Sequence, residues 1–387
     1  MFAKLAILIP TRNRGELACR AAMSVIKSQT RLPVDVIISD NSTDGSESAV
    51  IDSFLAEQGP HAVTLIRPSV PLPMAEHWQW AIARAMSVQD ASHFFVLTDR
   101  MLFKDGALAH LLAITEKYPD ELISFTYDRI NDYSCPASYL PLPRTGLLYR
   151  MDTRSLLRQT ANMVFYSCFP RMLNCVAPRN ILEKIQGKYG SVFSSVSPDY
   201  CFCFRVLGML PSMLYCDNSL LVNYASDRSN GASFSRGIAT KASADFERSL
   251  AIGALNSEAP IPAIRTVGNA IIHEYCSVRK ETGDCSYPDV VLRPYLDLLA
   301  GEVAAFLDPR AMSSANKILA DMGWRATTGF KMRLLIGKLL SRLLSMRKRK
   351  FGTLDEAIHY ATTHPSKNKP WVGGIHRRYG KQIMPLP

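Results

Sequence analysis

Short apolar runs that end in polar turns alternate with helix-like segments through the first third of the chain. Residues 4–9 and 34–38 are almost continuously apolar, which is typical of parallel strands inside a sheet. Residues 15–30, between them, have the apolar spacing of a helix. The pattern predicts a β-α-β unit with both polar turns at the carboxyl ends of its strands. Open α/β sheets bind ligands at that edge.

The strand–helix alternation continues to about residue 115 and then loosens. Before that point we expect strands at 63–67 and 93–97 and helices at 47–58, 74–87 and 106–114. After it we expect strands at 122–126, 146–149, 174–177 and 213–224, and helices at 152–160, 179–186 and 200–210. A polar loop is predicted at 226–237, and mainly helical structure from 238 to 387, whose last twenty residues look irregular. The predicted class is therefore α/β with a helical extension.

Composition is that of an ordinary globular protein, with 47% hydrophobic and 20% charged residues in 387 positions. The nine cysteines lack metal-ligand spacing, which favours reduced thiols in a cytosolic protein. The amino terminus has too few apolar residues for a signal peptide, and no stretch is apolar enough for a membrane span. We therefore expect a cytoplasmic protein.

The net charge of +11 is concentrated near the C-terminus, where residues 331–350 hold eight Lys and Arg and no acid. Apolar residues recur there at helical spacing, so a basic amphipathic helix is predicted at about 329–351. Such a helix is typical of an anchor on an anionic membrane, here the inner face. A helix docked on the protein with a solvated basic face fits the same pattern. Nucleic-acid binding is disfavoured, because the basic residues alternate with Leu and not with aromatics.

Polar side chains gather where the predicted strands end. They are Pro10 to Arg14, Asp40, the triplet Thr98-Asp99-Arg100 and, at a helix start, Asp199. Carboxylates suit contacts to a base and a ribose, and cations suit phosphates. The pattern predicts a nucleoside-diphosphate site, although each acid taken alone also fits a turn former or helix cap.

Several of these segments, taken in order, resemble family 2 glycosyltransferases with the GT-A fold. They are IPTRNR at 9–14, SDNSTDGS at 39–46, and residues 74–80, 97–100, 174–180 and 197–200. The resemblance covers roughly residues 4–235 and implies a GT-A-type, Rossmann-like mixed sheet flanked by helices. It implies a glycosyltransferase domain at 1–237, with a nucleotide-sugar half at about 1–115 and an acceptor half at about 116–237.

The resemblance also implies roles for the donor-site residues. Pro10 and Thr11 would line the nucleotide pocket, with Arg14 nearby, and Asp40 would hydrogen-bond the base, which is uracil in many members. In the family, a mobile loop after the catalytic acid often closes over the diphosphate. That comparison suggests Arg228, and with it Arg236, as phosphate contacts, against the alternative of a solvated surface loop.

The acidic motif of the family corresponds to Thr98-Asp99-Arg100, in which one carboxylate remains. The family motif contacts ribose and binds Mn²⁺ or Mg²⁺ through the diphosphate, so Asp99 is the candidate metal ligand. With a single acid, we expect metal dependence to be weak or absent. Arg100 could supply part of the missing positive charge, because a guanidinium matches phosphate oxygens.

Asp199 matches the catalytic base of inverting members. We therefore expect an inverting glycosyltransferase that moves a sugar from a nucleotide donor, a UDP-sugar, to a hydroxyl of a glycan or lipid-linked acceptor in surface polysaccharide synthesis. Tyr133 and Tyr139 could form part of an acceptor wall or pack in the core. The alternative function is a nucleotide-sugar-binding protein of the same fold without catalysis. A nucleotidyltransferase is disfavoured, because a Gly-rich phosphate loop is absent near the N-terminus.

Overall fold

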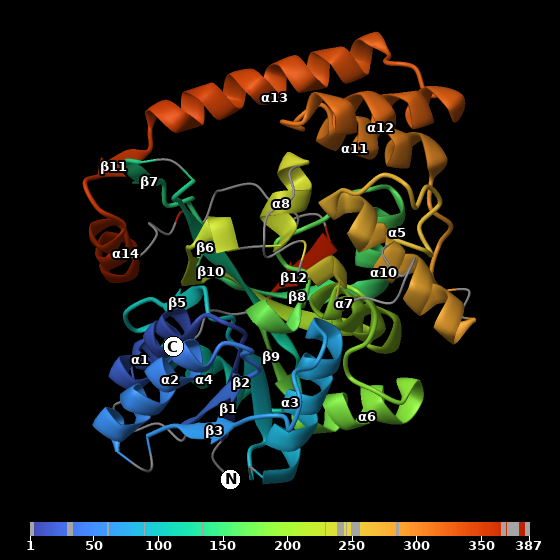
Figure 1. Ribbon diagram of the computed structural model, residues 1–387. Coiled ribbons are helices and arrows are strands. Elements are labelled where there is room, and N and C mark those ends of the chain that lie inside the picture. The colour runs from blue at the N-terminus through green and yellow to red at the C-terminus, as the bar shows by residue number, and fades with distance from the viewer. Residues whose placement is uncertain are drawn as a thin grey trace.

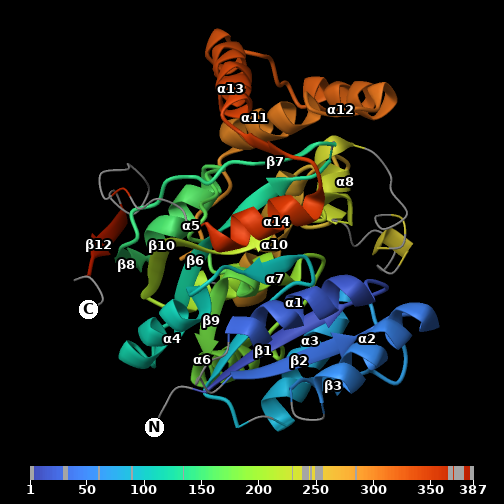
Figure 2. The same cartoon turned by 90° about the vertical axis from the view of Figure 1, so that its left-hand side faces the viewer.

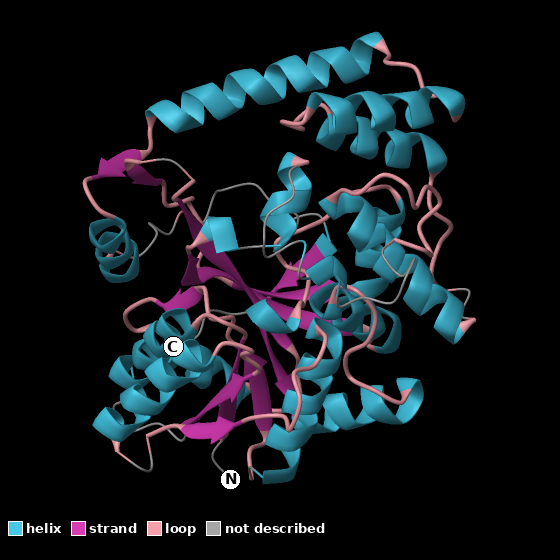
Figure 3. Cartoon of the chain, viewed as in Figure 1, coloured by secondary structure: helices cyan, strands magenta, loops and turns pink. Residues whose placement is uncertain are grey.

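A mixed sheet runs through the molecule and helices cover both of its faces (Figures 1 and 3). The computed structural model describes residues 4–28, 34–59, 62–88, 90–133, 135–228, 230–237, 244, 246–248, 256–283, 286–364, 369 and 379–383. The main path of the sheet has the strand order β12-β8-β10-β6-β9-β4-β1-β2-β3. This confirms the predicted fold class, a mixed sheet flanked by helices with a mainly helical C-terminal extension.

The first half is the parallel unit expected from the apolar runs. Its strands are β1 (Leu5–Thr11), β2 (Val34–Asp40), β3 (Thr64–Ile66) and β4 (His93–Val96), and its helices are α1 (Gly15–Ser28), α2 (Gly45–Gln58), α3 (Met74–Val88) and α4 (Ala107–Lys117). β1 pairs in parallel with both β2 and β4, and Thr11 lies opposite Asp40 in the register. The polar ends of these strands therefore meet at one edge of the sheet.

The second half adds strands in both directions. They are β5 (Met101–Phe103), β6 (Ile123–Asn131), β7 (Ala137–Tyr139), β8 (Leu148–Asp152), β9 (Cys175–Pro178) and β10 (Ser212–Asn223). The helices are α5 (Thr153–Ala161), η1 (Met172–Asn174), α6 (Arg179–Tyr189), α7 (Pro198–Met209), η2 (Ser226–Arg228) and α8 (Asn230–Arg236). β9 is antiparallel to both β4 and β6, and it joins the two halves into one sheet.

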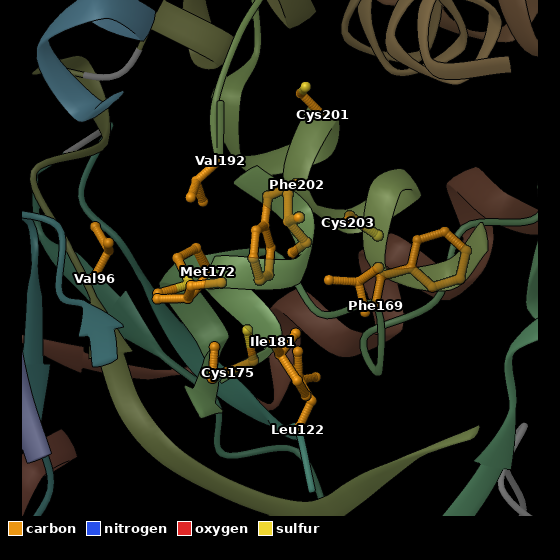
Figure 4. Packing of buried hydrophobic residues seen from close by; sticks show 14 of the residues in the cluster. Val96, Leu122, Phe169, Met172, Cys175, Ile181, Val192, Cys201, Phe202 and Cys203 are labelled. Carbon is orange, nitrogen blue, oxygen red and sulfur yellow. The ribbon is translucent and has the colours of Figure 1, made fainter. Parts of the chain in front are cut away.

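Alternation along the strands divides the core between the two faces of the sheet. In β1, Ala6 and Leu8 belong to the cluster under α3, α6 and α7, whereas Ile7 and Ile9 belong to the cluster under α1 and α4. Figure 4 shows part of the first cluster, with Phe202 and Cys203 of α7 among Phe169, Met172 and Cys175. This packing holds the start of α7, and therefore Asp199, against the sheet.

The C-terminal extension is mainly helical, as predicted. It contains α10 (Val267–Thr282), α11 (Leu292–Val303), α12 (Pro309–Asp321), α13 (Thr328–Met346) and α14 (Leu354–Thr363). α11, α12 and the first turns of α13 share a small core with Ile272 of α10. α10 also packs on α7, where the rings of Phe204 and Tyr275 lie 5.4 Å apart. No helix in the described residues is long and apolar enough to cross a membrane.

Four details differ from the sequence predictions. The basic helix predicted at 329–351 ends at Met346, because Arg349–Phe351 forms β11 and pairs with β7. The loop predicted at 226–237 contains η2 and the short helix α8. The C-terminal tail, predicted to be irregular, contains β12 (Gly380–Gln382), which pairs with β8. β5, β7, β11 and β12, of three residues each, were not predicted.

Candidate functional site

Four of the predicted site residues meet beyond the carboxyl ends of β1 and β4. The Thr11 hydroxyl donates to Asp99 Oδ2 at 3.0 Å, and Arg14 Nε lies 3.1 Å from the same oxygen. Arg14 Nη1 also donates to the carbonyl oxygen of Arg228 at 3.2 Å. Asn13 brings the chain round with a left-handed φ of 53°, a conformation that Asn tolerates better than most residues. Strand register and this turn together assemble the cluster.

Two other predicted residues lie in β1 and β2 themselves. Pro10 is buried in β1 opposite Ser39. Asp40 accepts hydrogen bonds from the Ser42 amide, the Ser48 hydroxyl and Arg67 Nε, at 3.0, 2.7 and 2.9 Å. Burial acts to raise the pKa of Asp40, but these hydrogen bonds outweigh it and hold the pKa below its usual value. Asp40 therefore organises the turn after β2, and its contact with a base stays a prediction.

Buried polar groups without partners surround Asp99. Within the described residues, Thr98 Oγ1, Arg100 Nε and Tyr224 Oη are buried and have no hydrogen-bond partner. Burial lowers the pKa of Arg100, while the charge of Asp99 acts to raise it. Burying donors without acceptors costs free energy, so such a group of donors is expected where an anionic ligand supplies the acceptors. A diphosphate has that chemistry.

Asp199 lies in the first turn of α7, next to a group of residues that the sequence did not reveal. It is half-buried, and burial raises its pKa, whereas the positive charge of Arg171 acts to lower it. Arg171 donates to the hydroxyls of Tyr127 and Tyr200 at 3.0 and 3.3 Å and lies over both rings. Arg171 follows Pro170 in a segment without periodicity, and only the fold brings it to Asp199.

Tyr127 connects the two groups of residues. It interacts electrostatically with Arg100 on one side and with Arg171 and Asp199 on the other. The arginine-rich cluster around Asp99 and the carboxylate of Asp199 therefore share one neighbour.

Glu274 of α10 holds the segment just before Asp199. Its fully buried carboxylate accepts from the amides of Val196 and Ser197 at 3.0 and 2.6 Å. The neighbouring Ser195 has a left-handed φ of 66°, and its hydroxyl lies 3.0 Å from Nε2 of His273. Burial raises the pKa of Glu274 to about 8. An element of the C-terminal extension thus positions the candidate base, which the sequence did not predict.

The raised pKa of Glu274 predicts a pH-dependent stability. In the unfolded chain this carboxyl releases its proton near its ordinary pKa of 4.5, but in the folded protein only near 8. The folded state then binds more protons, so the free energy of unfolding falls as pH rises from about 4.5 to about 8. We expect Glu274→Gln to remove this contribution, because the amide does not ionise and its oxygen still accepts both hydrogen bonds.

Denaturant unfolding of both proteins across that pH range measures the effect. Glu183→Gln, a substitution at an exposed position of α6, is the matched control and is expected to keep the wild-type pH dependence. Equal pH dependence in wild type and Glu274→Gln would show that Glu274 is already ionised in the folded protein.

A pocket of about 450 Å³ adjoins the Asp99 cluster through two shared residues, Arg14 and Arg228. Its other walls come from α1, α2, the segments after β6 and β10, and the C-terminal extension, and include Leu17, Glu47, Tyr133, Ala225, Gly352, Thr353 and Leu354. Arg236 lies 5.2 Å from the centre of the Tyr133 ring. Asp199 is not part of the lining. The pocket therefore lies beside the Asp99 cluster and not beside Asp199.

The two tyrosines considered for an acceptor wall lie in different surroundings. Tyr133 lines the pocket. Tyr139 is buried in the core, and its hydroxyl donates to Asp128 at 2.7 Å, beside the ion pair of Asp128 with Lys104. Tyr139 is therefore a packing residue, and its place in an acceptor wall is excluded.

The residues around Asp99 offer a divalent metal ion few ligands of their own. Mn²⁺ and Mg²⁺ prefer several oxygen ligands, with carboxylates among them. Asp99 is the one acid of its triplet, and its Oδ2 is already engaged by Thr11 and Arg14. In the part of the chain that the structure describes, no group of three or more His, Cys, Asp or Glu residues could hold a metal. Weak or absent metal dependence therefore stays a prediction.

Neither a protein-family model nor a curated protein matches the sequence. Among solved structures, S. aureus TarS is similar at 11% identity and a TM-score of 0.42, over 80% of this chain and 50% of that chain. TarS 1–349 in complex with UDP-GlcNAc is similar at 10% identity and a TM-score of 0.44, over 80% and 82% of the two chains. A further structure of TarS 1–349 is similar at 10% identity and a TM-score of 0.41, over 81% of this chain and 83% of that chain. The chain spans half the length of the longest of these three, and the likeness concerns the fold alone.

Proposed function

We propose that this chain is an inverting glycosyltransferase that transfers a sugar from a UDP-sugar donor to a hydroxyl of a glycan or glycolipid. The observation that supports the proposal is the pair of clusters on either side of Tyr127. One presents Arg100, with buried donors that lack partners, and the other presents the carboxylate of Asp199. This reaction needs positive charge or hydrogen-bond donors to stabilise the anionic leaving group, and a general base to activate the acceptor hydroxyl.

In the proposed mechanism Asp199 accepts the proton of the acceptor hydroxyl. The oxygen then attacks the anomeric carbon of the sugar as the bond between that carbon and the diphosphate oxygen breaks. The nucleoside diphosphate leaves with the bonding electron pair, and its growing charge is balanced by Arg100 and Arg14. One displacement on the face opposite the leaving group inverts the anomeric centre. Because burial raises the pKa of Asp199, the carboxylate is a stronger base than an exposed one.

The donor is identified by the nucleotide sugar that stabilises the folded protein. We expect a UDP-sugar, tested as UDP-GlcNAc and UDP-glucose beside GDP- and dTDP-sugars, to raise the melting temperature. A ligand at about 100 times its Kd adds about 2.7 kcal/mol to stability. We expect the same shift in EDTA and in Mn²⁺, because arginines take the place of the metal. A shift seen only with Mn²⁺ would contradict the metal-free site, and no shift with any donor would contradict the proposed function.

The second candidate is a nucleotide-sugar-binding protein without catalysis. It is favoured by the pairing of Asp99 with Arg14, which leaves a single engaged acid where the family motif has several. Donor hydrolysis separates the two candidates. A transferase releases nucleoside diphosphate slowly in water, whereas the binding protein shows the thermal shift without any release.

A further inference from the structure

The apolar stripe of α13 is exposed to solvent. Eight of its apolar side chains are 43–82% exposed, and they are Met332, Leu335, Ile336, Leu339, Leu340, Leu343, Leu344 and Met346. Figures 1 and 2 show α13 along the outer edge of the molecule, far from the amino terminus. Exposed stripes of this size mark a surface that binds a partner. The helix is therefore not docked on the protein through its apolar face, the second of the two arrangements that the sequence left open.

The helix is held at its two ends. At the start, Phe330 is buried against Trp324, with ring centres 5.1 Å apart, and Arg333 donates to Asp297 of α11 at 2.8 Å. At the end, β11 pairs with β7. Between these two ends, every residue from Leu335 to Arg347 is exposed. The fold thus presents the apolar face outward and does not cover it.

The charges beside the stripe have one sign. Lys331, Lys338 and Arg342 follow one another at spacings of seven and four, which places them along one border of the apolar face. Within the described residues none of these three makes an ion pair. Arg347 and Lys348 continue the positive charge at the helix end, and residues 331–350 contain no acid. The partner must therefore offer an apolar region to the stripe and negative charge to the basic residues that border it.

We propose that α13 binds the surface of an anionic phospholipid bilayer and lies in the plane of its headgroups. The apolar face enters the acyl boundary, and the lysines and arginines contact lipid phosphates. A second copy of the chain fits the stripe less well, because pairing two copies of α13 would set basic residues beside basic residues with no acid to balance them.

The position of α13 in the chain connects this surface to the site. After α13 the chain forms β11, and Gly352, Thr353 and Leu354 then line the pocket that also contains Arg14 and Arg228. On the proposed function, on which this step rests, the bilayer brings a lipid-linked acceptor to the enzyme. The membrane contact itself needs no donor and is tested without one.

Co-sedimentation of the full chain with vesicles tests the proposal. We expect binding to phosphatidylcholine–phosphatidylglycerol vesicles, weak binding to phosphatidylcholine alone, and loss of binding in high salt. The triple variant Leu335→Ser, Leu339→Ser and Leu343→Ser should bind at least about 100-fold more weakly, because three apolar side chains no longer enter the acyl boundary. The variant Lys338→Ser with Arg342→Ser should bind about 30-fold more weakly, which is about 2 kcal/mol.

The matched control replaces three exposed leucines elsewhere, Leu142, Leu292 and Leu307, by serine and should bind as the wild type does. Unchanged binding of the α13 triple variant would overturn the proposal. So would a wild-type dimer in light scattering that the same variant converts to monomer, since a second copy would then cover the stripe. The thermal shift with UDP-sugars should persist in the triple variant, so failure here is distinct from failure of the proposed function.

Discussion

Asp199→Asn is expected to lower the turnover of sugar transfer by about 10²–10⁴-fold while donor binding is kept. The amide has the shape of the carboxylate and can still cap the first turn of α7, but it does not accept the acceptor proton. In the wild type, the rate should rise with pH as Asp199 loses its proton, and burial moves that rise above the ordinary range for an aspartate. Steady-state transfer assays across pH measure both effects.

The control for Asp199→Asn is Asp152→Asn, at the amino-terminal cap of α5, where the same change affects a cap alone. It should leave turnover unchanged. Thermal shifts with donor should be equal in wild type and in Asp199→Asn. Near-normal turnover of Asp199→Asn would show that Asp199 is not the general base and serves only as a helix cap.

Arg100→Gln is expected to lower turnover by about 10²–10³-fold, the usual cost of removing one donor to a developing negative charge. Arg100 is half-buried, its Nε is buried and has no partner within the described residues, and its charge lies beside Asp99 and Arg14. Arg100→Lys should recover only part of the loss, because an ammonium restores the charge without the planar pair of donors. Single-turnover assays at saturating donor separate this loss from weaker donor binding.

Arg84→Gln, at an exposed position of α3, is the matched control for charge and should behave as the wild type. Wild-type turnover of Arg100→Gln would mean that the diphosphate charge is balanced elsewhere. Arg14 and Arg228 would be the next residues to test.

The fold was predictable where the apolar pattern had a clear period. β1, β2 and β4 are mostly apolar because most of their residues are buried on both faces of the sheet, and α1 and α3 carry an apolar stripe. β11 lacks such a signal, since its partner β7 lies some two hundred residues earlier in the chain. Its three residues form a strand through pairing and not through their own preference.

The site was predictable where strand ends carry it. Thr11, Arg14 and Asp99 meet because parallel strands end at the same edge. Asp40 shows the limit of that argument, because Arg67 and Ser48 occupy its carboxylate and no local pattern announces them. Arg171 and Glu274 reach Asp199 through tertiary packing alone, so no spacing in the sequence could have named them.

The position of Glu274 limits how far the chain can be truncated from its C-terminus. The sequence suggests residue 237 as the end of a minimal fragment, but Glu274 and α10 lie beyond it and support the segment before Asp199. β11 and β12, also beyond it, pair with β7 and β8 of the preceding part. A fragment ending at 237 would lack β11 and β12. It would also lack Glu274, which holds the segment before Asp199. Removing the part of the chain after 237 would therefore disturb both the sheet and the segment before Asp199.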